Sequence, residues 1–434
     1  MADRTGSLTE LGRDETEAVT LVNSLKREAR FVLRHRAFVT WILVVLGAAS
    51  FAVWSGIAEV EQQRESIAFL SESDRTDRTE QFTSQSDWGA AAYYSFHLTH
   101  DAPSNFAFAA LGQRDTSSWK HRIRMLALEG QIYEHDPGNP ELALVGRFDF
   151  AFFVAFVLPL ILIFILHDMQ ASERSAGRFN LLVASVADDR SLWRHRALVR
   201  SAGVLIAAII PLTFGGIVSG TSAFTLATAA AWVIAYGIFW TIVCSWVASR
   251  DRNAQTILAS LVGIWILLST IIPAGSRVLI EHLVPIPEGA DILMTQREAV
   301  NDAWDLPVSA TMTPFYARHP EWTGYEYTGD GFEWGWYYAF QQVGDQTAES
   351  LSDDYREGRV ERDRLAGLFA LAAPPALLER QLQNLAATDM QSVLAYENRV
   401  RLFHSELRNF YYPGLFGNQP FDPARVEDLP EFIP

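Results

Sequence analysis

The chain has 434 residues, 49% of them apolar, and a formal net charge of −16. An acidic balance of this size argues against nucleic acid as a partner, because nucleic-acid binding needs a cationic surface. Cys244 is the only cysteine, which excludes a disulfide within the chain.

The apolar residues gather in five blocks, each with a core free of charged side chains. A helix needs about 20 apolar residues to cross a hydrocarbon layer of about 30 Å, and a charge at its centre would cost several kcal/mol. One such block could be a buried core helix, but five in one chain predict a polytopic α-helical membrane protein. We expect spans at 37–57 (span one), 149–167 (span two), 201–218 (span three), 223–247 (span four) and 254–273 (span five).

Basic residues set the expected orientation. Arginines and lysines crowd the end of segment 1–36, recur in segment 168–200, and occur as Arg250 and Arg252 between spans four and five. By the positive-inside rule these segments are cytoplasmic. Segments 58–148 and 274–434 then form two extracytoplasmic domains, α/β or mainly α.

The N-terminal part predicts two helices. Residues 17–36 have the pattern of an amphipathic interfacial helix that leads into span one, and span one begins too late and is too long for a signal peptide. After span one, residues 59–71 form an acid-rich helix candidate. A polar, low-complexity stretch follows at 71–87.

One motif in segment 58–148 resembles a metal site. His97-Leu-Thr-His100 places two histidines three residues apart, so that they would share one face of a helix. The sequence offers no obvious third ligand nearby. Metal binding is therefore the less favoured interpretation.

Segment 168–200 combines an apolar patch with arginines. The apolar residues are Phe179, Leu181, Leu182 and Val183, and the cationic ones are Arg174, Arg178, Arg190, Arg194 and Arg196. This pattern is typical of a short helix that lies under the membrane against a partner.

The later spans carry further signals. Residues 219–222 are a connection so short that spans three and four must be antiparallel neighbours. Pro159 in span two and Pro211 in span three predict kinks. We expect span five to end at Ile272-Pro273.

The tail, 274–434, contains two different sequence patterns. Residues 315–340 combine aromatic residues with glycines, as in strands and hairpins, whereas 351–410 predict helix. The apolar run 365–378 is interrupted by Pro374-Pro375 and is too short to cross a membrane. It forms either a re-entrant or interfacial element, which would supply a sixth membrane segment, or an ordinary buried helix. The aromatic run around Trp334-Gly-Trp336 is more typical of a core than of a ligand groove.

The sequence lacks the common catalytic motifs. A phosphate-binding loop needs Gly-Lys followed by Ser or Thr, and the two lysines, Lys26 and Lys120, do not follow glycine. His-Glu-x-x-His, Cys-x-x-Cys and Gly-x-Ser-x-Gly are also missing. We expect no catalytic residue and no bound cofactor in this chain, which would not be an enzyme by itself.

The sequence also resembles a known family. The stretch SERSAGRFNLLVASVADDRSLWRHRALVRSA is similar to the cytoplasmic signature of type 2 ABC transporter permeases, with matching positions at Glu173, Gly177, Leu181, Leu182, Arg190 and Arg196. The flanks HLTHDAPSNFAFAALGQRD and NPELALVGRFDFAFFVAFVLPL resemble a bacterial subgroup labelled as multicopper-enzyme-maturation permeases. The tail sequence LAAPPALLERQLQNLAATD resembles the domain of unknown function that ends those proteins. Two details depart from the pattern: Arg178-Phe179 replaces Thr-Leu, and Ser185-Val186 stands where a proline is common.

The resemblance implies a permease subunit of an ABC transporter in the bacterial cytoplasmic membrane. Two copies of a separate cytoplasmic ATPase, which binds ATP and Mg²⁺, would dock on segment 168–200, and a second permease subunit, identical or paralogous, would pair along the spans. ATP hydrolysis would then drive export, or mechanical work on an envelope protein. The residues implied in coupling are Glu173, Arg174, Gly177, Arg178, Phe179, Leu181, Leu182 and Arg190. Copper as the cargo has no support here, because the chain has no thiol or methionine cluster.

A function of another class stays open. The spans could anchor extracytoplasmic domains that bind a ligand or scaffold an envelope partner, with no ATPase involved. An intramembrane enzyme is disfavoured because the spans contain no nucleophile paired with a base.

Overall fold

The computed structural model describes residues 25–134, 148–185, 189–329 and 331–434, and its regular structure is almost entirely helical. Five helices are long and apolar enough to cross a membrane. They are Arg36–Thr83, Phe150–Ser175, Arg190–Val218, Ala223–Ala248 and Ala254–Leu283. The five expected spans are thus present as helices, as in a helical membrane protein; the expected interfacial helix at 17–36 is described only from residue 25, where it is helical over 25–33.

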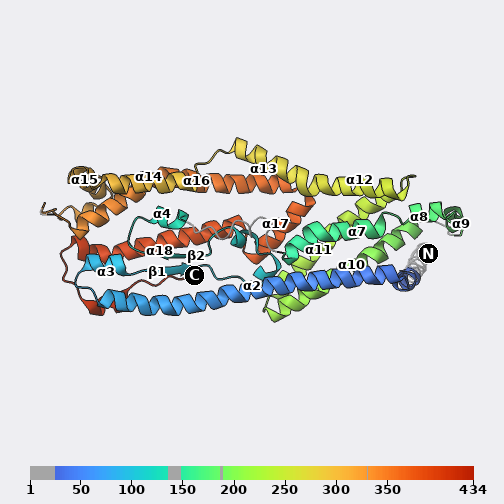
Figure 1. Ribbon diagram of the computed structural model, residues 1–434, viewed down its shortest axis with the longest axis horizontal. Helices are drawn as coiled ribbons and strands as arrows, with labels where there is room; N and C mark the ends of the chain where they lie inside the picture. Colours follow the sequence, from blue (N-terminus) through green and yellow to red (C-terminus); the bar gives the residue numbers. More distant parts are fainter. Residues whose placement is uncertain (1–24, 135–147, 186–188, 330) are drawn as a thin grey trace, which may run out of the picture.

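The first of these helices is much longer than a membrane requires. Helix α2 (Arg36–Thr83) runs for 48 residues, or about 70 Å at 1.5 Å per residue, and extends along nearly the whole molecule (Figure 1). The sequence predicted a helix only over 59–71, and the polar, low-complexity stretch after it continues the helix to Thr83. Side-chain pairs one turn apart support its polar half, among them Arg78 with Asp74 at 3.2 Å.

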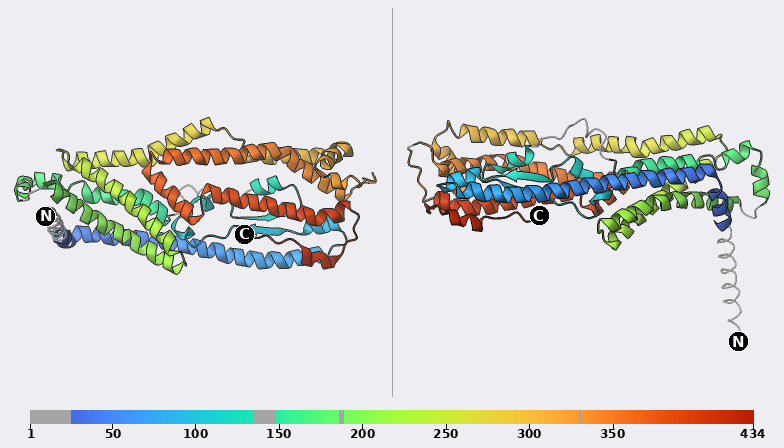
Figure 2. Two further views of the ribbon diagram at one scale, coloured as in Figure 1. Left: turned by 180° about the vertical axis from the view of Figure 1, so that it is seen from behind. Right: turned by 60° about the horizontal axis from the view of Figure 1, so that its bottom comes forward.

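The spans form a bundle at one end of the molecule. Helix α10 (Asp189–Val218) packs along α2 and along α11 (Ala223–Ala248), which itself packs on α7 (Leu158–Leu166) (Figures 1 and 2). The tight connection 219–222 makes α10 and α11 antiparallel neighbours, as predicted. Trp240, Phe150 and Phe153 are fully buried in this bundle.

Two spans contain a π-helical turn directly before a proline. Span two consists of α6 (Phe150–Phe152), the π-turn η3 (Phe153–Val157) and α7, with Pro159 at the start of α7. Span five repeats this arrangement with α12 (Ala254–Ile266), η4 (Leu267–Ile271) and α13 (Ile272–Leu283), with Pro273 at the start of α13. The helix does not end at Pro273, where we expected span five to end: the wider turn accommodates the proline ring, and the helix continues to Leu283.

A tyrosine compensates for one of these prolines. Pro159 has no N–H, so the carbonyl of Ala155, four residues earlier, lacks its α-helical donor. The hydroxyl of Tyr236, on α11, donates to that carbonyl at 2.6 Å in a buried position. This bond joins span two to span four.

Most described residues of segments 58–148 and 274–434 form one module, which we call the distal module. It contains the far half of α2 together with the first segment after it and the tail. Its elements are α3 (Trp88–Tyr94), β1 (His97–His100), η2 (Gly112–Asp115), β2 (Lys120–Ile123), α4 (Leu128–Tyr133), α14 (Gly289–Asp302), α15 (Val308–Arg318), η5 (Pro320–Trp322), α16 (Trp334–Ala370), α18 (Met390–Phe416) and η6 (Pro423–Asp428). Phe82, Ile123 and Leu128 share a single core with Phe315, Tyr338 and Val400, so the two domains expected from the sequence are one body.

Buried ion pairs also join the two segments. Arg401 of α18 donates to both carboxylate oxygens of Glu129 of α4 at 2.8 Å, and Ser352 of α16 donates to the same carboxylate at 2.7 Å. Burial alone would raise the pKa of Glu129, but the bonds from Arg401 and Ser352 outweigh burial and lower it. The carboxylate is therefore kept charged between three helices.

The aromatic stretch 315–340 differs from its prediction. Instead of strands and hairpins, it contains the end of α15, the 3₁₀ turn η5, a loop and the start of α16. Trp336 and Tyr338 are buried and pack with Phe340 in the core of the distal module, which supports a core over a ligand groove. Within the described ranges, β1 and β2 are the only strands.

The apolar run 365–378 is divided between two helices. Helix α16 ends at Ala370, and α17 (Pro374–Ala386) begins with the proline pair at its first turn, where a missing N–H is tolerated. Leu378, Leu382 and Ala386 join the hydrophobic cluster of the spans, and α17 contacts α11, α6 and η4. No sixth span-length apolar helix occurs among the described residues. Since α17 packs on the spans, the choice between a re-entrant or interfacial element and an ordinary buried helix stays a prediction.

We expect Tyr236→Phe to destabilise the protein by about 1 kcal/mol, because the carbonyl of Ala155 would stay buried without a donor. Thermal unfolding of the full chain in detergent measures this effect. Thr228→Val is the matched control, because the Thr228 hydroxyl is exposed and bonds only to Phe224 of its own helix. Equal stability of Tyr236→Phe and the parent would show that the bond contributes nothing.

Candidate coupling site

The described part of segment 168–200 contains two short helices and the start of α10, at the end of the span bundle opposite the distal module (Figure 1). Helix α8 (Ala171–Ser175) is followed by Gly177, whose φ of +69° suits glycine, and then by α9 (Phe179–Ala184). The N–H of Arg178 donates to the carbonyl of Glu173 and that of Gly177 to the carbonyl of Arg174, both at 3.0 Å. These two bonds form a Schellman motif, so Gly177 terminates α8 and sets the direction of α9.

Glu173 binds two arginines within the chain. One carboxylate oxygen accepts from Arg178 at 2.9 Å, and the other lies 3.6 Å from Arg196 of α10. Arg196 lies in turn 3.4 Å from Glu28, and both of these side chains are buried. Glu173 therefore links α8 to α10 and to the helix over 25–33, which leads into α2.

Arg174 connects the same segment to the turn between spans four and five. Its guanidinium donates to the carbonyl oxygens of Arg250 at 2.8 Å and Ser249 at 3.3 Å, directly after α11. It also lies 4.7 Å from the ring centre of Phe179. A cation at the carbonyl end of α11 is favourably placed against the helix dipole.

The apolar patch of α9 is divided between an inward and an outward side. Phe179 stacks on Trp193 of α10, with ring centres 5.7 Å apart and planes 9° apart, so it is used inside the chain. Leu181 is 75% exposed, and Leu182 and Val183 are partly exposed. Arg190 lies in the first turn of α10 and is exposed. Of the predicted apolar contacts for a partner, Leu181 and Leu182 are presented outward and Phe179 is not.

Several residues that hold the site together were not predicted as site residues. They are Glu28, Gln170, Trp193, Arg196, Ser249 and Arg250. Arg196 was noted among the arginines of the segment and in the family signature, but not among the residues implied in coupling. A signal was present for Glu28, an acidic residue within an otherwise basic segment, but its partner lies far along the chain.

The histidine pair has a different geometry from the one expected. His97 and His100 lie on β1, not on a helix, so residues three apart point to opposite faces of the strand. His97 is buried against Phe403, and neither of its ring nitrogens has a hydrogen-bond partner among the described residues. Within the same residues no group of three or more His, Cys, Asp or Glu side chains could hold a metal ion. The geometry thus adds no third ligand.

We expect Arg196→Met to destabilise the protein by about 3 kcal/mol, because it leaves the Glu28 carboxylate buried without its ion-pair partner. The double variant Glu28→Met with Arg196→Met should recover most of that loss. Thermal unfolding in detergent compares them. Arg178→Met is the control, since this exposed partner of Glu173 should contribute less than about 1 kcal/mol. A double variant as unstable as Arg196→Met alone would contradict the pairing.

His97 should make stability depend on pH. Burial lowers the pKa of His97 to about 3, with a further contribution from Arg78, whereas an unfolded histidine titrates near 6.5. Between these values the unfolded chain takes up a proton that the folded chain does not, so stability should fall by up to about 1.4 kcal/mol per pH unit as the pH drops below 6.5.

His97→Leu should reduce that fall. Unfolding of the full chain in detergent at pH 7, 6 and 5 would measure it, with His282→Leu, on the exposed surface of α13, as a control for loss of an imidazole. Parallel stability curves for His97→Leu and the parent would contradict the assignment.

Comparison with known proteins covers the tail alone. Residues 291–434 match a family described as "Domain of unknown function (DUF3526)". These residues form α14 to α18 and the C-terminal end, less than half of the chain. No curated protein and no solved structure matches the sequence.

Proposed function

We propose that this chain is the membrane-spanning subunit of an ABC transporter and that α8 and α9 form the contact with a separate ATPase. The observation that carries this proposal is Leu181, an apolar side chain 75% exposed on a short helix whose other contacts fasten it to the spans. An exposed leucine on a rigidly held helix is suited to enter an apolar groove of a partner. The sequence resemblance to type 2 permeases supports the same assignment.

The contacts of the segment explain how a push on α9 would reach the rest of the molecule. Phe179 and Glu173 bind α10, and Arg174 binds the connection before α12. Through Arg196, Glu173 is also linked to Glu28 in the helix that leads into α2. Helix α2 and span five both continue toward the distal module (Figure 2). Movement of α8 and α9 would therefore act on three spans at once.

The proposal includes the partners implied by the resemblance. Two ATPase copies would supply ATP and Mg²⁺, and this chain would hold no cofactor and perform no catalysis itself. A second permease subunit, identical or paralogous, would pair with the spans. Span five, the least buried of the five, offers a surface for that subunit or for the lipid bilayer. The N-terminus and the α8–α9 segment would face the cytoplasm of a bacterium and the distal module its envelope.

Helix α2 favours mechanical work over simple passage of a small substrate. It is continuous from the span region to the far end of the distal module, so a tilt at one end moves the other. This variant of the proposal includes an envelope protein as the object of that movement. The alternative, an anchored scaffold without an ATPase, leaves the outward position of Leu181 unexplained.

We expect Leu181→Asp with Leu182→Asp to abolish co-purification of an ATPase with the C-terminally tagged chain from detergent-solubilised membranes of its source cell. ATP hydrolysis by the purified complex is the readout. Asn180→Asp is the matched control, because it adds a charge at the neighbouring exposed position of α9 and should leave hydrolysis unchanged. Purification of the parent chain without any ATP hydrolysis would favour the scaffold.

A further inference from the structure

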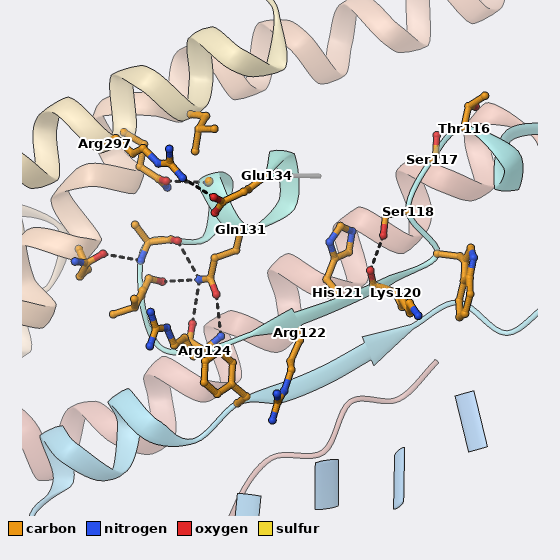
Figure 3. A pocket seen from close by; sticks show the side chains of 18 of the residues that line it. Thr116, Ser117, Ser118, Lys120, His121, Arg122, Arg124, Gln131, Glu134 and Arg297 are labelled. Carbon is orange, nitrogen blue, oxygen red and sulfur yellow. Dashed lines mark hydrogen bonds and ion pairs between the residues drawn. The ribbon is translucent and has the colours of Figure 1, made fainter. Parts of the chain in front are cut away.

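A positively lined pocket lies between β2, α4 and α14 in this acidic chain. Its volume is about 950 Å³, and five Arg or Lys side chains line it against three Asp or Glu (Figure 3). The cations are Arg114, Lys120, Arg122, Arg124 and Arg297, and the anions are Glu59, Asp115 and Glu134. Arg297 is paired with Glu134 and Arg114 with Asp101, both at 2.6 Å, and Arg122 lies 3.5 Å from Asp77. Lys120 is exposed and lies over the Trp119 ring at 4.8 Å.

One edge of a β-strand borders this pocket. The antiparallel sheet pairs Leu98 with Arg122 and His100 with Lys120, and the N–H of Asp101 donates to the carbonyl of Trp119 at 2.8 Å. Alternate residues of a strand direct their backbone groups to opposite edges. The backbone carbonyl of Trp119 faces β1. The backbone N–H and C=O groups of Lys120 and Arg122 therefore point away from β1, toward the pocket.

At neighbouring positions of the sheet edges, side chains form hydrogen bonds with the backbone groups of the strands. On the outer edge of β1, the carboxylate of Asp74 accepts from the N–H of Leu98 at 3.0 Å. At the end of β2, the amide of Gln131 accepts from the N–H of Arg124 at 2.9 Å and donates to its carbonyl at 3.1 Å, as a neighbouring strand would (Figure 3). Unpaired strand edges are commonly covered in this way.

The middle of the β2 edge is left open. Ser118 donates to the carbonyl of Lys120. The N–H of Lys120 and both backbone groups of Arg122 have no hydrogen-bond partner within the described residues. These three backbone groups lie on either side of the Lys120 carbonyl, beside a pocket lined by more cationic than anionic side chains. They match the requirements of an extended, acidic peptide.

We propose that an extended segment of a partner protein, with acidic side chains at alternate positions, binds in this pocket as a third strand along β2. Its backbone would pair with Lys120 and Arg122, and its acidic side chains would lie on the face that carries the side chains of these two residues. The opposite face holds the partly exposed His121, stacked on Tyr396, which suits an apolar residue of the peptide. This inference does not depend on an ATPase partner.

The first test uses the full chain in detergent and a fluorescent, capped peptide, Thr-Glu-Val-Glu-Val-Thr. Fluorescence anisotropy should show saturable binding. Two control peptides carry N-methyl groups on alternate amides, one on the odd and one on the even positions. Each keeps its charge but loses the backbone donors on one edge. The peptide methylated on the edge that faces β2 should bind about tenfold more weakly. Equal binding of both methylated peptides and the parent peptide would mean adsorption by charge alone and would overturn the proposal. Absence of saturable binding would overturn it as well.

The second test changes the protein. Lys120→Glu should weaken binding of the peptide several-fold, whereas Arg75→Glu, an exposed change on α2 outside the pocket, should not. Hydrogen exchange should show that the peptide protects the amides of Lys120 and Arg122. Equal effects of the two charge reversals, or unprotected amides with the peptide bound, would place the peptide elsewhere.

Discussion

A backbone inside a membrane must satisfy its hydrogen bonds without water, and the rest of this structure depends on how the chain meets that requirement. Five helices do so internally, and two of them contain a proline that removes a backbone donor. In both, a π-helical turn directly precedes the proline, and in span two the hydroxyl of Tyr236 supplies the missing donor. The prolines thus shape the spans without interrupting them, and span five can reach the distal module.

The two ends of the molecule are held together by different forces. In the distal module, an aromatic core and buried ion pairs such as Glu129 with Arg401 join segments that lie far apart in the sequence. At the opposite end, Glu173, Arg174 and Phe179 fasten two short helices to the cytoplasmic side of the spans in the proposed orientation. Leu181 remains on the outside of that assembly. The site is therefore rigid where it meets the spans and open where a partner would bind.

The spans could be predicted from composition alone, since only helices fit long uncharged apolar segments in lipid. The continuation of α2 to Thr83 could not, because its polar half has little apolar periodicity and is stabilised by pairs such as Asp74 with Arg78 and by packing on the tail. The aromatic stretch 315–340 was misread for a similar reason. Its glycines and aromatic residues favour strands locally, but the shared core favours a helix from Trp334.

The candidate site was predictable in place and not in its internal contacts. The amphipathic pattern indicated Arg174, Leu181 and Leu182 in the segment after span two, and the family resemblance added Glu173. Neither indicated that Arg174 donates to the carbonyls of Ser249 and Arg250, because every residue type has a backbone carbonyl and the sequence does not show which one accepts. The inward position of Phe179 was also not indicated, because Phe179 belongs to the same apolar pattern as Leu181 and Leu182. Its stacking on Trp193 of α10 is seen only in the structure.

The length of α2 has a consequence for how the sequence can change. Each residue of an α-helix turns the chain by about 100°, so one residue added or removed between the spans and Phe82 would rotate the buried face of the distal half away from the tail. Insertions of seven residues, close to two full turns, would restore that face but lengthen the rod by about 10 Å. The helix thus fixes both the height and the helical phase of the distal module relative to the membrane.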